Sequence, residues 1–501
     1  MSEPTVMILD AGSSNLRCYI INQYGEVLGQ DKLEWDIIQD PEYPNIVEYD
    51  ISTLREKVKQ VIASTIQRSK INPKDIVAIS CIGQRLGTVF LDKDGKEIYA
   101  GPNIDSRGFL VMAPIDEYTQ ELYQITGHTP PHLFAPLRYL WFKENDAIKA
   151  QRITHILTLH DWIIYFLAGK LFTEPSTSSS TMLMDVRKSE WSAEVLRIFD
   201  IEEEMLPEIK PSGEIVGPVK KEIREYFGLS NETVVALGGG DTQFGILATG
   251  ALEQGDCGCV AGFTAPVQCV LNEPILDKEM RIWVERHVLP NKWVMESNPG
   301  MVGGLIDWFI QAFLSNIENP YKLLDETAKS IDPLEYNVQF FFGRNIMDAK
   351  RMSEMIPLAT ILFSNPIIPF MKRENLKTFM CGLIESLSYV IVANIEQVKK
   401  ISGVDIRKLG LTGGLTRLKS LTRIIASTLN REVNITSKHY GSPLGCAAML
   451  FYKLNYYPSL EKALNTIIPS QIVYPDKKYC ETYKDKYHDW LYNYERMKEG
   501  L

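Results

Sequence analysis

The chain has 501 residues, more than one hydrophobic core normally organises, so we expect two domains of roughly 250 residues each. Hydrophobic residues make up 45% of the chain and the net charge is −10, which is typical of a globular protein and argues against general binding to nucleic acid or to an anionic membrane. We see no signal peptide and no apolar stretch of membrane-spanning length, and we expect the eight cysteines to be reduced, so we predict a cytoplasmic protein.

The first two predicted strands are joined by a polar turn. An apolar run at residues 6–10 predicts a buried strand that ends on Asp10. The amides and hydroxyls of Ser13 and Ser14 suit an anion, and Arg17 on the returning strand can reach the same anion. The carboxylate of Asp10 would repel a phosphate bound at this turn. An aspartate at this position therefore indicates a divalent cation that lies between the carboxylate and the phosphate. An ordinary hairpin turn is the competing interpretation.

The rest of the first half alternates helices and strands. The spacing of apolar residues predicts a helix at 52–69, a strand at 76–82, a hairpin at 89–98, a mostly helical stretch at 116–169 and a strand at 233–237. The last strand runs through three glycines to Asp241. An aspartate in this position commonly caps a following helix, which is the competing interpretation for Asp241.

After Asp241 the pattern of the chain starts again. A strand at 256–260, a turn containing Gly262 and Thr264, and a second strand repeat the arrangement around Asp10. Further along we predict a long helix at 377–401, a strand at 408–411 that ends at Gly413 and Gly414, a helix at 418–429, a strand at 433–436 and a helix at 442–454. We therefore predict two similar α/β halves, residues 1–248 and 249–501.

Three of these segments together resemble the FGGY family of carbohydrate kinases. The hairpin after Asp10, the pair Gly240-Asp241 at a strand end, and Gly413-Gly414 before a helix stand in the family's order, and the likeness extends over nearly the whole chain. The resemblance implies an α/β fold with two actin- and hexokinase-like (ribonuclease H-like) ATPase domains and an active-site cleft between them. It also implies transfer of the γ-phosphoryl group of ATP, with Mg²⁺, to a hydroxyl of a small sugar, ketose or polyol.

The resemblance also implies roles for individual residues. Asp241 is the expected general base, because a sugar hydroxyl is a poor nucleophile until a carboxylate accepts its proton. The expected acceptor-binding residues are Gln84, Arg85, Asp105, Arg107 and Asp241. The expected ATP-binding residues are Ser13, Ser14, Arg17, Gly262, Thr264, Gly413 and Gly414, and the expected metal ligands are Asp10 and Asp241.

Departures from the family pattern bear on the acceptor. Leu86 stands where glycerol kinases carry a glutamate, which disfavours glycerol, and Gln84-Arg85 replaces the Met-His pair usual in xylulokinases. Segment by segment, the likeness is greatest to the branch that acts on autoinducer-2, a small linear polyhydroxy ketone, with xylulose or another pentulose as the alternative.

Two further alternatives stay open at this point. Phe263 replaces a glycine of the second phosphate turn, so a catalytically silent sugar or nucleotide sensor on the same fold is the rival from another class. No G-x-G-x-x-G follows a strand, which disfavours a dehydrogenase. A homodimer is one assembly that the sequence leaves open.

Overall fold

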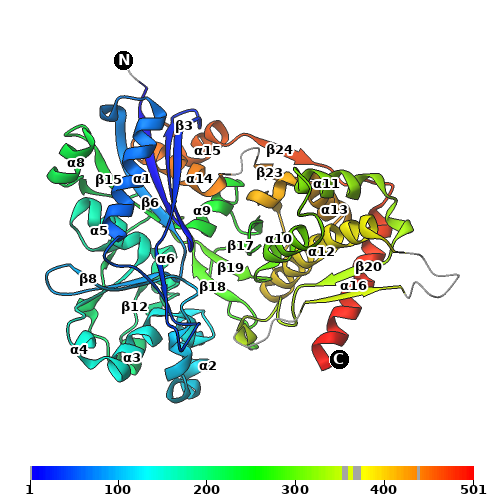
Figure 1. Ribbon diagram of the computed structural model, residues 1–501, viewed down its shortest axis with the longest axis horizontal. Coiled ribbons are helices and arrows are strands. Elements are labelled where there is room, and N and C mark those ends of the chain that lie inside the picture. The colour runs from blue at the N-terminus through cyan, green and yellow to red at the C-terminus, as the bar shows by residue number, and fades with distance from the viewer. Residues whose placement is uncertain (1–2, 353–358, 365–373, 437–439, 501) are drawn as a thin grey trace.

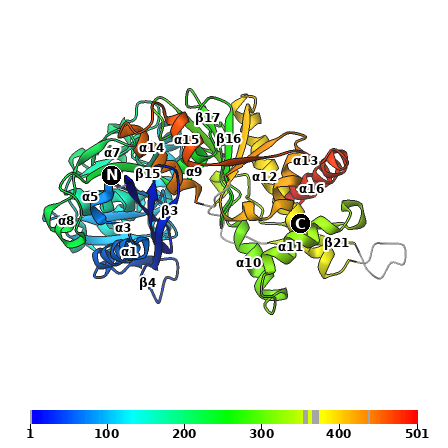
Figure 2. The ribbon, with the colours of Figure 1, turned by 90° about the horizontal axis from the view of Figure 1, so that it is seen from above.

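The computed structural model describes residues 3–352, 359–364, 374–436 and 440–500; Met1 and Ser2, part of the start that we expected not to be a signal peptide, lie outside them. Two lobes lie side by side, one mostly blue to green and the other mostly green to red (Figure 1), and the view from above shows the same two lobes (Figure 2). Each lobe is built on a mixed sheet flanked by helices. The predicted two-domain α/β fold is confirmed.

The two sheets share one plan. The first has the order β14-β15-β6-β1-β2-β3 and the second the order β18-β19-β17-β16-β22-β23-β24. In the first, β1 pairs antiparallel with β2 and parallel with β6, which is parallel to β15. In the second, β16, β17, β22 and β23 repeat these relations in the same order. The predicted repeat is therefore present in the strand pairing.

Where the sequence predicted a strand, the structure has one within a few residues of the expected range, whereas the strands at 215–218, 283–286, 293–297 and 470–473 were not predicted. The strands of the first sheet are β1 (Thr5–Ala11), β2 (Asn15–Asn22), β3 (Val27–Glu34), β6 (Ile76–Gly83), β14 (Ile215–Pro218) and β15 (Val234–Gly240). Those of the second are β16 (Asp256–Val260), β17 (Val267–Leu271), β18 (Trp283–Arg286), β19 (Trp293–Ser297), β22 (Lys408–Thr412), β23 (Val433–Thr436) and β24 (Ser470–Val473). The helical stretch at 116–169 also contains a strand, β9 (His155–Thr158), which joins the hairpin β7 (Thr88–Leu91) and β8 (Glu97–Gly101).

Helices cover both sheets. In the first lobe they include α1 (Leu54–Ser69), α2 (Thr119–Thr126), α3 (Ala135–Asn145), α5 (Leu159–Ala168), α7 (Ala193–Phe199), α8 (Lys221–Phe227) and α9 (Asp241–Ala248). The later helices include α10 (Val302–Phe313), α11 (Pro320–Ser330), α12 (Leu376–Ser402), α13 (Lys419–Thr428), α14 (Gly441–Lys453), α15 (Leu460–Ile467) and α16 (Cys480–Gly500).

Strand β1 is buried on both faces. Met7 and Leu9 point into the core shared with α1 and α5, whereas Val6 and Ile8 point into the core shared with α14 and α15. This alternation follows from the two-residue period of a strand. Because both faces are covered, β1 can present a polar side chain to a ligand only near its end, where Asp10 lies.

Helices α14 and α15 cross the boundary that the sequence suggests. They follow the second half in the chain, yet Leu444 and Leu464 share a core with Val6 and Ile8 of the first sheet. In Figure 1 both helices, in orange, lie beside the blue strands. The domain boundary between residues 248 and 249 stays a prediction. In the packing, α14 and α15 come after this boundary in the chain but lie against the first sheet.

Helix α12 corrects the expectation that no apolar stretch is long enough to span a membrane. Among the described residues, Leu376–Ser402 alone has sufficient length and apolar composition, but 94% of its most apolar window is buried inside the protein. A helix that is apolar on all sides is typical of a protein core as well as of a membrane.

The prediction that all eight cysteines are reduced is wrong for one pair. Cys257 and Cys269 form a disulfide, with their Cα atoms 4.1 Å apart. They lie directly opposite each other on β16 and β17. Strand register brings them together, and the spacing of cysteines in the sequence does not reveal register. The other six cysteines are free and buried.

Candidate active site

Three neighbouring parallel strands deliver the predicted polar residues to one edge of the first sheet. Gly83 of β6 is the register partner of both Ala11 of β1 and Gly240 of β15. The residues at these strand ends therefore lie close together, and they include Asp10, Gln84, Arg85 and Asp241. This convergence agrees with the sequence-based expectation.

The first hairpin leaves its hydroxyl groups open. The Gly12 amide donates to the Asn15 carbonyl at 3.0 Å and closes the turn. Arg17 is the register partner of Asp10, and its Nη1 lies 3.2 Å from Asp10 Oδ2. The hydroxyls of Ser13 and Ser14 have no hydrogen-bond partner within the described chain, so they are free for an anion.

The carboxylate of Asp241 binds a proton more tightly than the carboxylate of an ordinary aspartate does. It begins α9 directly after Gly240. Burial and the nearby Asp10 carboxylate raise the pKa of Asp241 to about 6, although Arg85 and the amide and hydroxyl of Thr242 act in the opposite direction. A carboxyl with this pKa is largely ionised at neutral pH and accepts a proton more readily than an ordinary aspartate.

Arg85 is held by two glutamates of the second lobe that the sequence analysis missed. Its Nη1 lies 2.7 Å from Glu285 Oε1 of β18 and 2.7 Å from Glu296 Oε2 of β19, and its Nη2 lies 2.8 Å from Glu296 Oε1. Burial alone would raise the pKa of Glu285, but the Arg85 guanidinium and His128 hold this pKa at about 2. Arg85 therefore joins the two lobes, and the glutamates take three of its five N–H donors.

Gln84 connects the first hairpin with the segment that follows β8. Its Nε2 donates to the Tyr49 hydroxyl at 2.7 Å, and its Oε1 accepts from the Asn103 amide at 2.8 Å. The Tyr49 hydroxyl in turn donates to the Ser13 carbonyl at 2.7 Å. Gln84 thus fixes the position of the phosphate hairpin relative to residue 103.

Asp105 and Arg107 lie behind the site. Both are 0% exposed, and Arg107 Nε donates to Asp105 Oδ2 at 2.7 Å. Arg107 Nη2 also donates to Glu48 at 2.7 Å, and Tyr99 donates to Asp105. Both side chains are enclosed in this structure, and their contact with the acceptor stays a prediction.

The turn between β16 and β17, which contains Gly262 and Thr264, lies against the segment that contains Gly413 and Gly414. We call this turn the second phosphate hairpin. The Ala261 amide donates to the Thr412 carbonyl at 2.8 Å, and the Leu415 amide donates to the Ala261 carbonyl at 2.9 Å. The hairpin itself is closed by a bond from the Gly262 amide to the Thr264 carbonyl at 2.8 Å. These bonds bring two segments about 150 residues apart in the chain into one site.

A cavity of about 550 Å³ opens beside this hairpin. It is lined by residues that include the predicted Gly262 and Gly414 and the unpredicted Gly303, Asp307, Tyr321 and Arg417. The helix predicted at 418–429 is present as α13, which starts at Lys419, and Gly414–Arg417 between the glycine pair and this helix forms a short 3₁₀ turn that was not predicted. Turn type depends on local backbone angles, which apolar spacing does not report.

Asp10 and Asp241 suit Mg²⁺. In the described part of the chain, no group of three or more His, Cys, Asp or Glu side chains is arranged to hold a metal. Mg²⁺ usually keeps several waters and is bound through one or two carboxylates together with substrate phosphates. Asp10 and Asp241 therefore offer donors of the kind and number that Mg²⁺ takes from a protein.

Two sheets that repeat one strand plan, each with a polar hairpin turn, and Asp10 and Asp241 at the edge of the first sheet are the arrangement expected of a two-lobed phosphotransferase. Residues 5–248 match the N-terminal domain of the FGGY family of carbohydrate kinases, and residues 256–454 match the C-terminal domain. The chain therefore belongs to the FGGY family of carbohydrate kinases, and it is a carbohydrate kinase.

Two curated relatives carry the same name. The autoinducer-2 kinase of Escherichia coli K12 is 26% identical over 499 residues, covering 97% of this chain and 93% of that protein. The autoinducer-2 kinase of Salmonella paratyphi A is 26% identical over 468 residues, covering 91% and 87%.

Solved structures share the fold. A ligand-bound xylulose kinase from Lactobacillus acidophilus superposes with a TM-score of 0.85 at 17% identity, covering 99% of both chains. A Plasmodium falciparum glycerol kinase with ADP superposes with a TM-score of 0.83 at 17% identity, covering 98% of both chains. At this identity the likeness supports the fold and says nothing of the acceptor.

We expect Gly413→Ala to weaken ATP use and Gly414→Ala to leave it nearly unchanged. Gly413 has a φ of 98°, and an added Cβ would lie 2.5 Å from the Ala261 carbonyl oxygen, whereas nothing lies within 4 Å of a Cβ at Gly414. The strain in Gly413→Ala should lower the free energy of unfolding by about 1–3 kcal/mol. We expect to measure it as a lower midpoint of thermal unfolding and a higher KM for ATP. Equal behaviour of the two variants would show that the turn is not part of the nucleotide site.

Proposed function

We propose that this chain transfers the γ-phosphoryl group of ATP to a hydroxyl of a small sugar, ketose or polyol, with Asp241 as the general base. The observation that carries the proposal is the meeting of Asp241, Asp10 and Arg85 at the ends of three parallel strands. The raised pKa of Asp241 supports its role, because a base must be ionised and still bind a proton well.

The proposed reaction uses two aspartates, the two hairpins after β1 and β16, and the segment around Gly413. Asp241 accepts the proton of the acceptor hydroxyl while the oxygen–phosphorus bond forms and ADP leaves. Ser13, Ser14 and Arg17 on one side and Gly262 and Thr264 on the other would bind phosphate oxygens, and Gly413 and Gly414 would face the nucleoside. Mg²⁺ held through Asp10 and Asp241 would neutralise phosphate charge.

The acceptor we favour is a small linear polyhydroxy ketone of the autoinducer-2 type. Support comes from the autoinducer-2 kinases that match 91–97% of this chain at 26% identity. Xylulose or another pentulose is the alternative. Leu86, the residue after Arg85, offers no carboxylate to a polyol hydroxyl, which disfavours glycerol.

A coupled assay of ADP release across ketoses and polyols of three to seven carbons tests the proposal. We expect acceptor-dependent ADP release with a linear ketose as the preferred acceptor. Preference for a pentulose would replace the favoured acceptor and keep the reaction. Slow ATP turnover that no acceptor stimulates would contradict the proposal and favour a silent sensor.

We expect Arg85→Leu to raise KM for the preferred acceptor by about 10- to 150-fold, the effect of losing a hydrogen bond worth roughly 1.5–3 kcal/mol. KM for ATP should change far less, since neither Arg85 nor the two glutamates that hold it line the cavity beside Gly262 and Gly414. The variant should also lose about 3–5 kcal/mol of stability, because Glu285 and Glu296 remain buried without their cation.

Arg85→Lys is the matched control. It keeps the charge between the glutamates and loses the planar fork, so its stability should lie nearer the parent while its acceptor KM is still raised. Steady-state kinetics with each substrate varied in turn, together with thermal unfolding, measure both effects. A loss that falls mainly on ATP would contradict the assignment of Arg85 to the acceptor side.

A further inference from the structure

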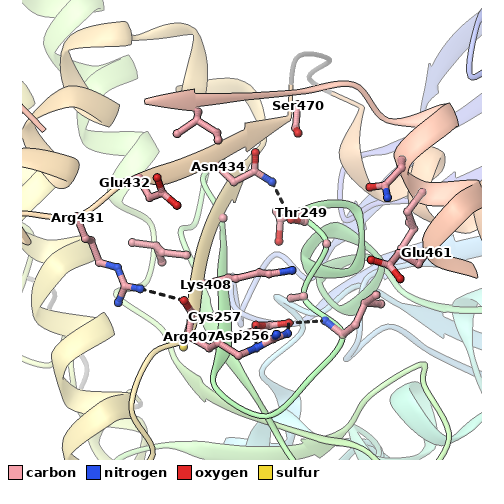
Figure 3. A pocket seen from close by; sticks show the side chains of 18 residues that line it. Thr249, Asp256, Cys257, Arg407, Lys408, Arg431, Glu432, Asn434, Glu461 and Ser470 are labelled. Carbon is pink, nitrogen blue, oxygen red and sulfur yellow. Dashed lines mark hydrogen bonds and ion pairs between the residues drawn. The ribbon is translucent and has the colours of Figure 1, made fainter. Parts of the chain in front are cut away.

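A second cavity lies at the ends of β16 and β22 that are farther from Gly262 and Gly413. Its volume is about 310 Å³, and its lining includes Asp256 and Lys408, the first residues of β16 and β22. The other ends of these two strands lead to Gly262 and Gly413. We call this cavity the hinge pocket, because the connection from α9 to β16, residues 249–252, forms one of its walls (Figure 3).

The walls of the hinge pocket come from both lobes. Leu464 of α15 belongs to the core that contains Val6 and Ile8 of the first sheet. Leu409 and Cys257 belong to the core of the second lobe. A movement of one lobe relative to the other therefore changes the shape of this pocket.

The two arginines of the hinge pocket are already engaged. Arg407 binds both oxygens of Asp256, at 2.8 and 2.7 Å. Arg431 donates to the carbonyls of Ile406 and Arg407, each at 3.2 Å. Neither guanidinium is therefore fully free to bind an anion.

Several other polar groups of the hinge pocket have no partner among the residues that the structure describes. Lys408 extends into the open space between the strands and α15, and Glu461 lies across from it (Figure 3). Glu461 and Asn465 share one face of α15 by their helical spacing. Within the residues that the structure describes, the side chains of Lys408, Glu432, Glu461 and Asn465 make no hydrogen bond or ion pair.

These free groups define the chemistry of a ligand. One free ammonium and two free carboxylates give no excess of positive charge, which disfavours a phosphate. The lining contains no aromatic side chain, which disfavours a nucleobase. Carboxylate, amide and ammonium groups beside apolar Leu252 and Leu464 suit an uncharged molecule with several hydroxyls. A volume near the lower end for ligand sites fits a molecule of sugar size.

We propose that the hinge pocket is a second binding site, separate from the cleft, for a small uncharged polyol or sugar, and that its occupancy changes phosphotransfer. A ligand that contacts both walls binds one relative position of the lobes more tightly than another, and so shifts the population toward it. Binding does not depend on the proposed function. Only the effect on phosphotransfer rests on it.

Binding of xylitol, ribitol and sorbitol to the full chain, measured by calorimetry, tests the site. Asn465→Trp should fill the pocket, while Lys462→Trp is the control, an exposed position on the same helix outside the pocket lining. We expect at least one polyol to bind the parent and Lys462→Trp at a site that is lost in Asn465→Trp. Lys408→Ala should weaken that site about 10-fold, as expected for a charged hydrogen bond.

The remaining outcomes are distinct. If no polyol binds, or if binding is unchanged in Asn465→Trp, the site is overturned. If inorganic phosphate or glycine binds there in preference to every polyol, the ligand class is overturned. The polyol that binds the hinge pocket should also change KM for ATP or for the acceptor in the parent and not in Asn465→Trp. If the kinetics of the parent are the same with and without this polyol, the proposed effect of the pocket on phosphotransfer is overturned. Absence of any kinase activity would contradict the proposed function and leave the calorimetric result standing.

Discussion

Asp241→Asn is expected to lower kcat by about 10²-fold or more, the scale of a general base, while the binding of ATP and acceptor is largely kept. Asparagine has nearly the same shape as aspartate and cannot accept the hydroxyl proton. Asp241 begins α9 next to Gly240, and its carboxylate lies near Asp10 and Arg85, so the change removes one negative charge from the centre of the site. Initial rates and equilibrium binding of each substrate separate the two effects.

Thr242→Val provides the control for Asp241. Thr242 follows Asp241 on the same helix, and its hydroxyl donates to Asp241 Oδ1 at 3.2 Å. Its loss should change kcat only a few-fold, because the carboxylate remains. A kcat for Asp241→Asn equal to that of the parent would remove Asp241 from the mechanism, and a loss confined to KM would make it a binding residue instead.

Asp10→Ala is expected to lose most Mg²⁺-dependent activity, by about 10²-fold or more, since a bound metal ion is worth several kcal/mol to phosphoryl transfer. Asp10 lies at the end of β1 with its carboxylate 3.2 Å from Arg17. Without the carboxylate the metal loses a protein ligand, and Arg17 loses the partner that orients it toward the hairpin.

Asp10→Asn separates charge from shape. It keeps the size of the side chain and a hydrogen-bond acceptor for Arg17, so a loss close to that of Asp10→Ala assigns the effect to the missing charge. Rates measured against Mg²⁺ concentration should show a weaker metal dependence in both variants. Normal activity with normal Mg²⁺ dependence in Asp10→Ala would show that the hairpin is only a turn.

Local patterns in the sequence were enough to predict the strand-to-turn segments of this protein. The apolar run before Asp10, the strand before Asp241 and the strand before Gly413 each appear in the structure close to the predicted place. They are readable because a buried strand needs consecutive apolar residues and a tight turn needs glycine or small polar residues. Both requirements are met within a few residues of each other along the chain.

Only the tertiary structure decided which distant residues meet. Glu285 and Glu296 reach Arg85 across 200 and 211 residues, and nothing in their local sequence distinguishes them from surface glutamates. The Cys257–Cys269 pairing depends on strand register, and the enclosure of Arg107 depends on the packing of the segment around it. Contacts of this kind arise when two faces pack together, so the side chains that meet are selected by the whole fold, whereas strands and turns are selected by their own residues.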